Sequence, residues 1–194
     1  MAESSTTSDT PAATGEPSWA TLHTTSGLIL RVRAEQPGDG PILIDLFDHL
    51  SPSSRYLRFS KSMNDPDRQR VQQEAERLAR LGPPMDMAWL AFVHSPDPTD
   101  AAVGAVRFFR TGPDEAELAV SVRDDRQRQG IGSALLSFAC TAAQEIGIQR
   151  LTATFRSENR GIWALIKRSP YPVSWRLDGP EVHAVMDLTA PRVA

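Results

Sequence analysis

Cysteine is almost absent from this sequence: Cys140 is the only one among 194 residues. A single cysteine excludes a disulfide within the chain, and it favours a reducing compartment, so we expect a cytoplasmic protein. Long apolar runs are also missing, which argues against a membrane-spanning helix and a membrane partner. The first 18 residues have neither the basic start nor the apolar stretch of a secretory signal.

An excess of positive charge is another feature that the sequence lacks. Its 21 lysines and arginines are balanced by 24 aspartates and glutamates, for a net charge of -3. A protein that binds nucleic acid through bulk charge is basic, so we expect no nucleic-acid partner. The four histidines are scattered along the chain and share no ligand spacing with the cysteine, so we expect no metal site.

Composition divides the chain into two parts. Residues 1–26 are rich in Ser, Thr, Pro and Ala and cannot bury enough apolar surface to offset the entropy of ordering. We therefore expect a disordered N-terminal tail there. The remaining part, residues 27–190, has a length that suits one domain with its own core.

Hydrophobic periodicity predicts an alternation of strands and helices in this domain. Apolar and alternating patterns favour strands over residues 27–33, 87–93, 101–110, 115–122 and 148–155, and a closing hairpin over 172–188 that turns at Asp178 and Gly179. Helix signals lie near residues 39–50, 51–59, 66–81, 131–146 and 157–168. This order predicts the α/β class, with a mixed, mainly antiparallel central sheet flanked by helices and one parallel contact near residues 127–132.

The segment from Gln127 to Gly132 places two glycines between a predicted strand and a predicted helix. The first N–H groups of a helix have no main-chain partner, and the helix dipole adds positive potential, so this turn suits a phosphate. Glycine lets such a group approach the main chain closely. A Walker A loop would need a lysine where Ser133 stands, and a Rossmann fingerprint would need a third glycine where Leu135 stands, so both nucleotide motifs match poorly.

The run QRQGIG at residues 127–132 resembles the Q/R-x-x-G-x-G/A signature of the GNAT superfamily of acyl-CoA-dependent N-acyltransferases. Residues 118–122 before it, residues 133–136 after it, and the later run ENRGIWALIKR are similar to the segments that accompany this signature. The run SPSSRYLRF, residues 51–59, is similar to a stretch found in bacterial protein-lysine acetyltransferase-type GNAT domains. The resemblance implies a GNAT-like acyl-CoA N-acyltransferase fold over about residues 28–188.

The ligand that this resemblance implies is acetyl-CoA, used as co-substrate without a metal. Its pyrophosphate would lie on the N–H groups of residues 127–132, and its pantetheine arm would pair with the main chain of residues 120–122 like an added strand. The implied cofactor-binding residues are Val120, Ser121, Val122, Gln127, Arg128, Gln129, Gly130, Ile131, Gly132, Ser133 and Asn159.

Transfer of an acetyl group to an amine needs a group that takes the amine proton. Glu117 lies in the predicted strand before the glycine turn, and the resemblance implies that it is the catalytic base. We expect apolar Trp89 or Phe108 near it, since apolar surroundings would make the carboxylate a stronger base. Ile166 stands where many GNAT members carry a tyrosine, so the resemblance supplies no side-chain acid for the leaving thiolate. Tyr171 lies nearby in the sequence.

Three functions stay open from the sequence. We favour an N-acetyltransferase that acts on a primary amine of a protein lysine, and a small-molecule amine is the second candidate. A non-catalytic CoA-binding regulatory module is the third. The expected state is a monomer or homodimer. Arg55, Tyr56 and Phe59 are candidates either to line the acceptor pocket or to belong to the core.

Overall fold

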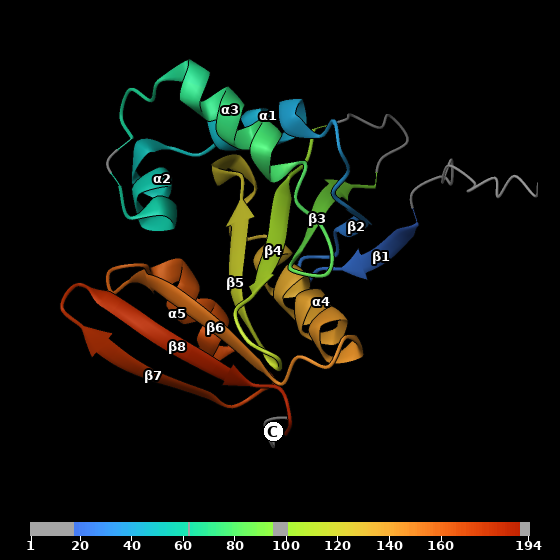
Figure 1. Ribbon diagram of the computed structural model, residues 1–194, viewed down its shortest axis with the longest axis vertical. Helices are drawn as coiled ribbons and strands as arrows, with labels where there is room; N and C mark the ends of the chain where they lie inside the picture. The colour runs from blue at the N-terminus through green and yellow to red at the C-terminus, as the bar shows by residue number, and fades with distance from the viewer. Residues whose placement is uncertain (1–17, 62, 95–100, 191–194) are drawn as a thin grey trace, which may run out of the picture.

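The computed structural model describes residues 18–61, 63–94 and 101–190, and Figure 1 shows a central sheet with helices on both of its faces. In these ranges the strands are β1 (Trp19–His23), β2 (Ile29–Ala34), β3 (Asp86–Val93), β4 (Gly104–Arg110), β5 (Glu115–Val122), β6 (Arg150–Arg156), β7 (Val173–Asp178) and β8 (Glu181–Asp187). The α-helices are α1 (Gly40–Asp48), α2 (Pro52–Phe59), α3 (Arg68–Leu78), α4 (Ile131–Glu145) and α5 (Arg160–Lys167). The predicted class, α/β with a mainly antiparallel sheet, is confirmed.

The strand order across the sheet is β1-β2-β3-β4-β5-β6-β8-β7, and β5–β6 is the one parallel pair among the described strands. This parallel ladder is short and ends at Glu117 opposite Thr152. Strand β5 stays paired with β4 as far as Val122, while β6 stays paired with β8 as far as Arg156. Beyond the ladder β6, β8 and β7 turn away from β5 (Figure 1), so one edge of β5 has no strand partner in the part of the chain that the structure describes.

Helix α4 covers the face of the sheet that carries Val106, Leu118 and Val120. Its buried residues include positions 131, 135, 139 and 142, the spacing of one apolar helix face. Gly147, with a φ of +79°, follows the helix, and its N–H donates to the Gln144 carbonyl, so the glycine ends this helix as the sequence predicts. No helix in the described ranges is long and apolar enough to cross a membrane.

Helix α2 lies over the gap that opens between β5 and β6. The hydroxyl of Ser51 accepts a main-chain N–H of the first turn, so this serine begins the helix as its sequence predicts. Arg58 of α2 donates a hydrogen bond to Ser121 of β5. The guanidinium of Arg156, on β6, stacks on Tyr56 at 5.0 Å from the ring centre. The helix therefore bridges the two strands where they have separated.

Strand β1 lies inside the segment that composition assigns to the tail. Its sequence WATLH alternates, and Ala20 and Leu22 pack against the core beneath α4. The strand pairs with β2 from Trp19 opposite Arg33 to His23 opposite Ile29. The ordered part of the chain therefore begins before residue 27, and the Ser- and Thr-rich composition around WATLH hides this short alternation. Residues 1–17 of the tail predicted for residues 1–26 lie outside the described residues.

Candidate active site

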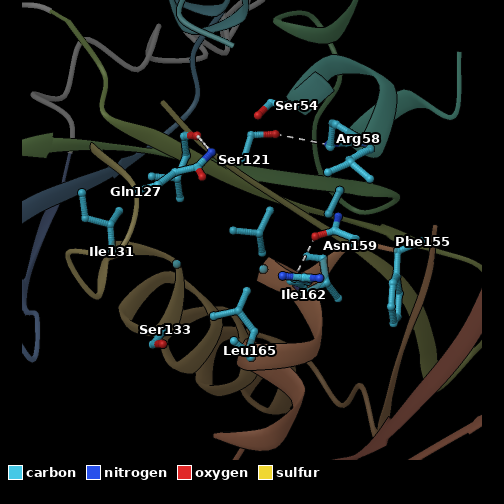
Figure 2. Close-up of a pocket in the computed structure, with 18 of the residues that line it drawn as sticks. Ser54, Arg58, Ser121, Gln127, Ile131, Ser133, Phe155, Asn159, Ile162 and Leu165 are labelled. Carbon is cyan, nitrogen blue, oxygen red and sulfur yellow. Dashed lines mark hydrogen bonds between the residues drawn. The ribbon is translucent and has the colours of Figure 1, made fainter. Parts of the chain in front are cut away.

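A groove of about 910 Å³ occupies the gap between β5 and β6. Its walls come from α2 on one side and from α5 and the loop before α4 on the other, as Figure 2 shows. The residues that the sequence assigns to catalysis or cofactor binding all line this groove, except Gln129. The carbonyl of Gln129 accepts a hydrogen bond from the Ser26 hydroxyl at 2.8 Å, so it supports the loop from outside the groove.

The open edge of β5 presents main-chain groups to the groove. Main-chain groups alternate sides along a strand. The N–H of Arg123 donates to a carbonyl beside β4 at 3.0 Å, and the carbonyl of Val122 accepts from a side chain of the following loop at 3.4 Å. Val120 and Val122 therefore direct their N–H and C=O groups away from β4 and toward the groove. The main chain of Ser121 faces β4, so this residue meets the groove through its side chain.

The loop between β5 and α4 forms a concave row of N–H groups. Arg128 and Gly130 both have a left-handed φ, of +60° and +79°. The first hydrogen bond of α4 runs from the Ala134 N–H to the Gly130 carbonyl at 3.0 Å, so the N–H groups of residues 131–133 have no partner within the helix. Such a row at a helix N-terminus suits an anion. Arg126 and Arg128 line the groove at the same end.

The two glycines of the motif have different surroundings. A Cβ on Gly130 would lie 2.7 Å from Thr25 Oγ1 and 3.0 Å from Thr25 N, because the β1–β2 turn packs on this loop. A Cβ on Gly132 would meet only the side chains of Leu165 and Val122, at 3.5–3.8 Å, which is ordinary contact. Glycine is therefore needed at position 130 for the packing of Thr25 and for the left-handed φ. At position 132 neither reason applies, and the missing side chain leaves space in the groove.

Asn159 begins α5 and lies in the groove wall. Its side-chain carbonyl accepts the Ile162 N–H at 3.1 Å (Figure 2), which satisfies one of the free N–H groups at the start of the helix. This bond fixes the rotamer of the asparagine. Its side-chain NH₂ group has no hydrogen-bond partner among the described residues, so a donor remains for a ligand.

The position that lacks a tyrosine does not face the main groove. Ile166 packs with Phe155 and Val182 and is not among the residues that line the groove. Tyr171, the tyrosine closest to it in sequence, donates its hydroxyl to Gln144 Oε1 at 3.1 Å and is not among the residues that line the groove. The described residues therefore place no tyrosine hydroxyl in the groove.

Glu117 lies on the α2 side of the groove, on the face of β5 that also carries Ser121, and its side chain is exposed. Arg58 reaches the same place, where its Nε donates to Ser121 Oγ at 3.2 Å (Figure 2). Burial lowers the pKa of the Arg58 guanidinium, and the negative charge of Glu117 opposes that shift. A carboxylate and a guanidinium thus lie close together on the α2 side of the groove.

The expected apolar neighbours of Glu117 lie elsewhere. Trp89 and Phe108 stack on each other, with ring centres 5.3 Å apart, and Trp89 also packs edge-on against Phe138 of α4. Phe108 lies opposite Leu118 in the β4–β5 pairing, so the two side chains share a face of the sheet. Glu117 precedes Leu118 on β5 and therefore points to the other face. The expectation that Trp89 or Phe108 surrounds Glu117 is therefore wrong.

Arg55, Tyr56 and Phe59, which the sequence offers either to the acceptor pocket or to the core, do not line the groove. Arg55 stacks on Phe47, Phe59 packs against the same ring, and Tyr56 holds Arg156. The residues of α2 that line the groove are Ser54, Leu57 and Arg58. They share one face at i, i+3 and i+4 spacing. The sequence misses Arg58 because SPSSRYLRF gives no sign of which of its two arginines points inward.

Strand β6 supplies a further polar group that the sequence does not single out. Thr154 lines the groove, and its hydroxyl lies 3.1 Å from His183 Nδ1. The other ring nitrogen of His183 lies 3.8 Å from Asp178 Oδ2. Within the described ranges no three histidine, cysteine, aspartate or glutamate side chains cluster as metal ligands.

A mainly antiparallel sheet with one parallel pair, and a glycine turn that leads from a strand into a helix, is what the resemblance to an acyltransferase family implies. The chain belongs to that family: the model of the acetyltransferase (GNAT) family matches residues 45–169, which is more than half of the chain.

Solved structures agree on the fold. The GNAT domain of S. lividans PAT is similar at 24% identity, over 87% of this chain and 96% of that one, with a TM-score of 0.73. RimL, a ribosomal L7/L12 alpha-N-protein acetyltransferase, is similar at 19% identity, over 91% of this chain and 97% of that one, with a TM-score of 0.61. A cAMP-binding acyltransferase from Mycobacterium smegmatis is similar at 23% identity and a TM-score of 0.60, over 90% of this chain and only 48% of that one. The expected GNAT-like fold is confirmed.

Proposed function

We propose that this protein is an acetyl-CoA-dependent N-acetyltransferase that moves an acetyl group to a primary amine, with a protein lysine as the favoured acceptor. The observation that carries the proposal is the open edge of β5, which leads through one continuous groove from the anion-binding loop to Glu117. In acetyl-CoA the diphosphate would bind the loop before α4, and the amides of the pantetheine arm would pair with the open edge of β5.

The residues of the groove fit this co-substrate. The N–H groups of residues 131–133 would hold the pyrophosphate, with Arg126 and Arg128 at the same end. The amides of the pantetheine arm would pair with the main chain of Val120 and Val122, as a strand added to an open edge. The free NH₂ of Asn159 would donate to the arm from the opposite wall.

Glu117 is assigned the role of base. A lysine amine, with a pKa of about 10.4, is mostly protonated at neutral pH, so Glu117 would take a proton from it directly or through a water. The amine nitrogen then bonds to the thioester carbonyl carbon, and the N–H of Val120 donates to the oxygen that becomes negative. The C–S bond breaks and CoA leaves as a thiolate. Water takes the second proton from the nitrogen, which gives the neutral amide, and water protonates the thiolate, because Ile166 offers no acid.

Two observations support a protein lysine as the acceptor. Residues 51–59 resemble protein-lysine acetyltransferases, and these residues form helix α2, whose Ser54, Leu57 and Arg58 line the acceptor side. A small-molecule amine would use the same chemistry and is the second candidate. The cytoplasmic location and the monomeric or dimeric state stay predictions.

The proposal is tested by measuring CoA release from acetyl-CoA with lysine peptides, peptides with a free N-terminus and small amines. A thiol reagent suits this assay, because burial raises the pKa of Cys140 to about 12 and no other cysteine exists. Release with lysine peptides supports the proposal, and release with small amines alone selects the second candidate. Acetyl-CoA binding without release for any amine favours a non-catalytic CoA-binding module. Absence of acetyl-CoA binding overturns the assignment.

A further inference from the structure

A second, smaller cavity lies next to the groove, between the sheet and helices α4 and α5. Its volume is about 60 Å³. Its walls are mostly apolar and include Leu118 and Val120 of β5, Leu151 of β6, Leu136 of α4, and Leu165 and Ile166 of α5. No charged side chain occurs among the described residues that line it. A cavity with such walls stays dry and accepts apolar groups.

The cavity and the groove share a wall. Leu118, Val120 and Leu165 line both of them. Leu118 follows Glu117, the residue at which the β5–β6 ladder ends, so the cavity adjoins the deep end of the groove. The anion-binding loop lies at the other end of the open edge, after Val122.

The direction of a ligand along this edge rests on the proposed function. With its diphosphate on residues 131–133, the pantetheine arm would run along β5 from Val122 toward Leu118. The sulfur at the end of the arm, and the acyl group bonded to it, would then arrive at the wall that groove and cavity share. The carbonyl carbon would stay on the side of Glu117, and the carbons beyond it would face the cavity.

We propose that this cavity is an acyl-chain subsite, and that the protein binds propionyl-CoA and butyryl-CoA more tightly than acetyl-CoA and transfers those acyl groups as well. A volume of about 60 Å³ is about twice the roughly 30 Å³ that one water takes up in the liquid, so it accommodates about two further methylene-sized groups. An acyl group that ends in a carboxylate is excluded, because a buried charge without a partner is costly.

Calorimetric titration of the full chain with a series of CoA thioesters tests the subsite without any knowledge of the acceptor. Affinity should rise about fourfold for each methylene from acetyl- to propionyl- to butyryl-CoA, which corresponds to about 0.8 kcal/mol per step. It should fall again at hexanoyl-CoA, which exceeds the volume. Succinyl-CoA should bind more than tenfold more weakly than butyryl-CoA.

Filling the cavity should remove this gradient. In Ile166→Phe the larger ring would occupy the space, so propionyl- and butyryl-CoA should bind no more tightly than acetyl-CoA, whose affinity should change less than twofold. Ile29→Phe makes the same exchange at an exposed position of β2 and should keep the wild-type gradient. Should Ile166→Phe fail to fold, Ile166→Ala tests the same space, because its larger cavity should move the tightest binding to a longer chain.

The outcomes separate this inference from the proposed function. Tight binding of acetyl-CoA together with affinities that stay level or fall from acetyl to butyryl overturns the subsite alone. A wild-type gradient that survives in Ile166→Phe also overturns it, because the added carbons then lie elsewhere. Failure of CoA and of every thioester to bind overturns both the proposed function and the subsite.

Discussion

On the α4 side of the groove, most of the polar groups belong to the main chain, namely the N–H groups of residues 131–133 and the open edge of β5, with the side chains of Arg126, Arg128 and Asn159 beside them. On the α2 side they are side chains, and they come from three separate elements: Arg58, Glu117 and Thr154. A main-chain site depends on local conformation, which a short motif encodes. A side-chain site depends on how distant elements pack, so the two sides differ in how they respond to substitution.

The largest expected effect is a loss of kcat on substitution of Glu117, on the α2 side of the groove, without a loss of acetyl-CoA affinity. Glu117→Gln keeps the shape of the side chain but removes the proton acceptor, so kcat should fall by roughly 10²- to 10⁴-fold while acetyl-CoA affinity stays unchanged. Raising the pH should partly restore the rate, since more of the acceptor amine is then neutral. Steady-state kinetics and calorimetry measure the two quantities separately.

Glu115 offers a matched control for this experiment. It lies two residues earlier on β5, and its carboxylate lies 3.3 Å from Arg150 Nε rather than in the groove. Glu115→Gln should leave kcat within about threefold of wild type, on the general scale of surface substitutions. A large loss in Glu115→Gln without one in Glu117→Gln would mean that the wrong carboxylate is assigned. A loss in His183→Gln of the size expected for Glu117 would move the base to β8.

The second effect tests the main-chain side through its two glycines. Gly132→Val should weaken acetyl-CoA binding more than tenfold, about 1.4 kcal/mol, because the branched side chain enters the space beside the free N–H groups. Gly130→Ala should instead lower the melting temperature, because its Cβ meets Thr25 and its φ is left-handed. Calorimetry and thermal unfolding of both variants check this division. Unchanged affinity in a folded Gly132→Val variant would argue against a diphosphate at this loop.

The third effect concerns the side-chain wall. Arg58→Gln removes the positive charge that faces Glu117 and the bond to Ser121, so kcat/KM for the acceptor should fall about tenfold. The affinity for acetyl-CoA should stay within twofold, because Arg58 lies on the other side of the groove from residues 131–133. Arg55→Gln is the control, since Arg55 stacks on Phe47 on a different face of the same helix. Equal losses of kcat/KM in both variants would show that the positive charge of α2 as a whole matters, and not the position of Arg58 beside Glu117.

The same difference explains how much of the molecule the sequence predicts. The glycine turn between a strand and a helix, the apolar face of α4 and the capping Ser51 are each encoded over a short stretch, and the structure agrees with each of them. The one parallel contact follows from the order of the elements, but it lies at residues 115–117, at the end of β5 away from the glycine turn. The resemblance implies a cofactor contact for Gln129, but its carbonyl accepts a hydrogen bond from Ser26, 103 residues earlier, which no local pattern reports. Arg58 was missed and Trp89 was misplaced for a similar reason. Their position depends on which helix or sheet face meets the groove.

The smallest expected effect is a change in melting temperature on removal of strand β1. The turn that follows β1 packs on the loop before α4, because Thr25 lies next to Gly130. A chain that begins at Ser18 should keep the melting temperature of the full chain. A chain that begins at Gly27 loses the pairing with β2, the packing of Ala20 and Leu22, and the contact of Thr25 with Gly130. At about 2–4 °C for each kcal/mol in a domain of this size, we expect a drop of several degrees.

Acetyl-CoA affinity distinguishes what the lost segment does. If the β1–β2 turn holds the loop in its concave form, the chain that begins at Gly27 should bind acetyl-CoA more weakly than the chain that begins at Ser18, even well below its melting temperature. Replacing Thr25 alone by valine keeps the bulk beside Gly130 but removes the hydroxyl, so it should leave the melting temperature within about a degree of wild type. Equal melting temperatures and affinities for the two shortened chains would show that β1 contributes nothing to the fold or to the loop, and that the domain starts where composition alone would place it.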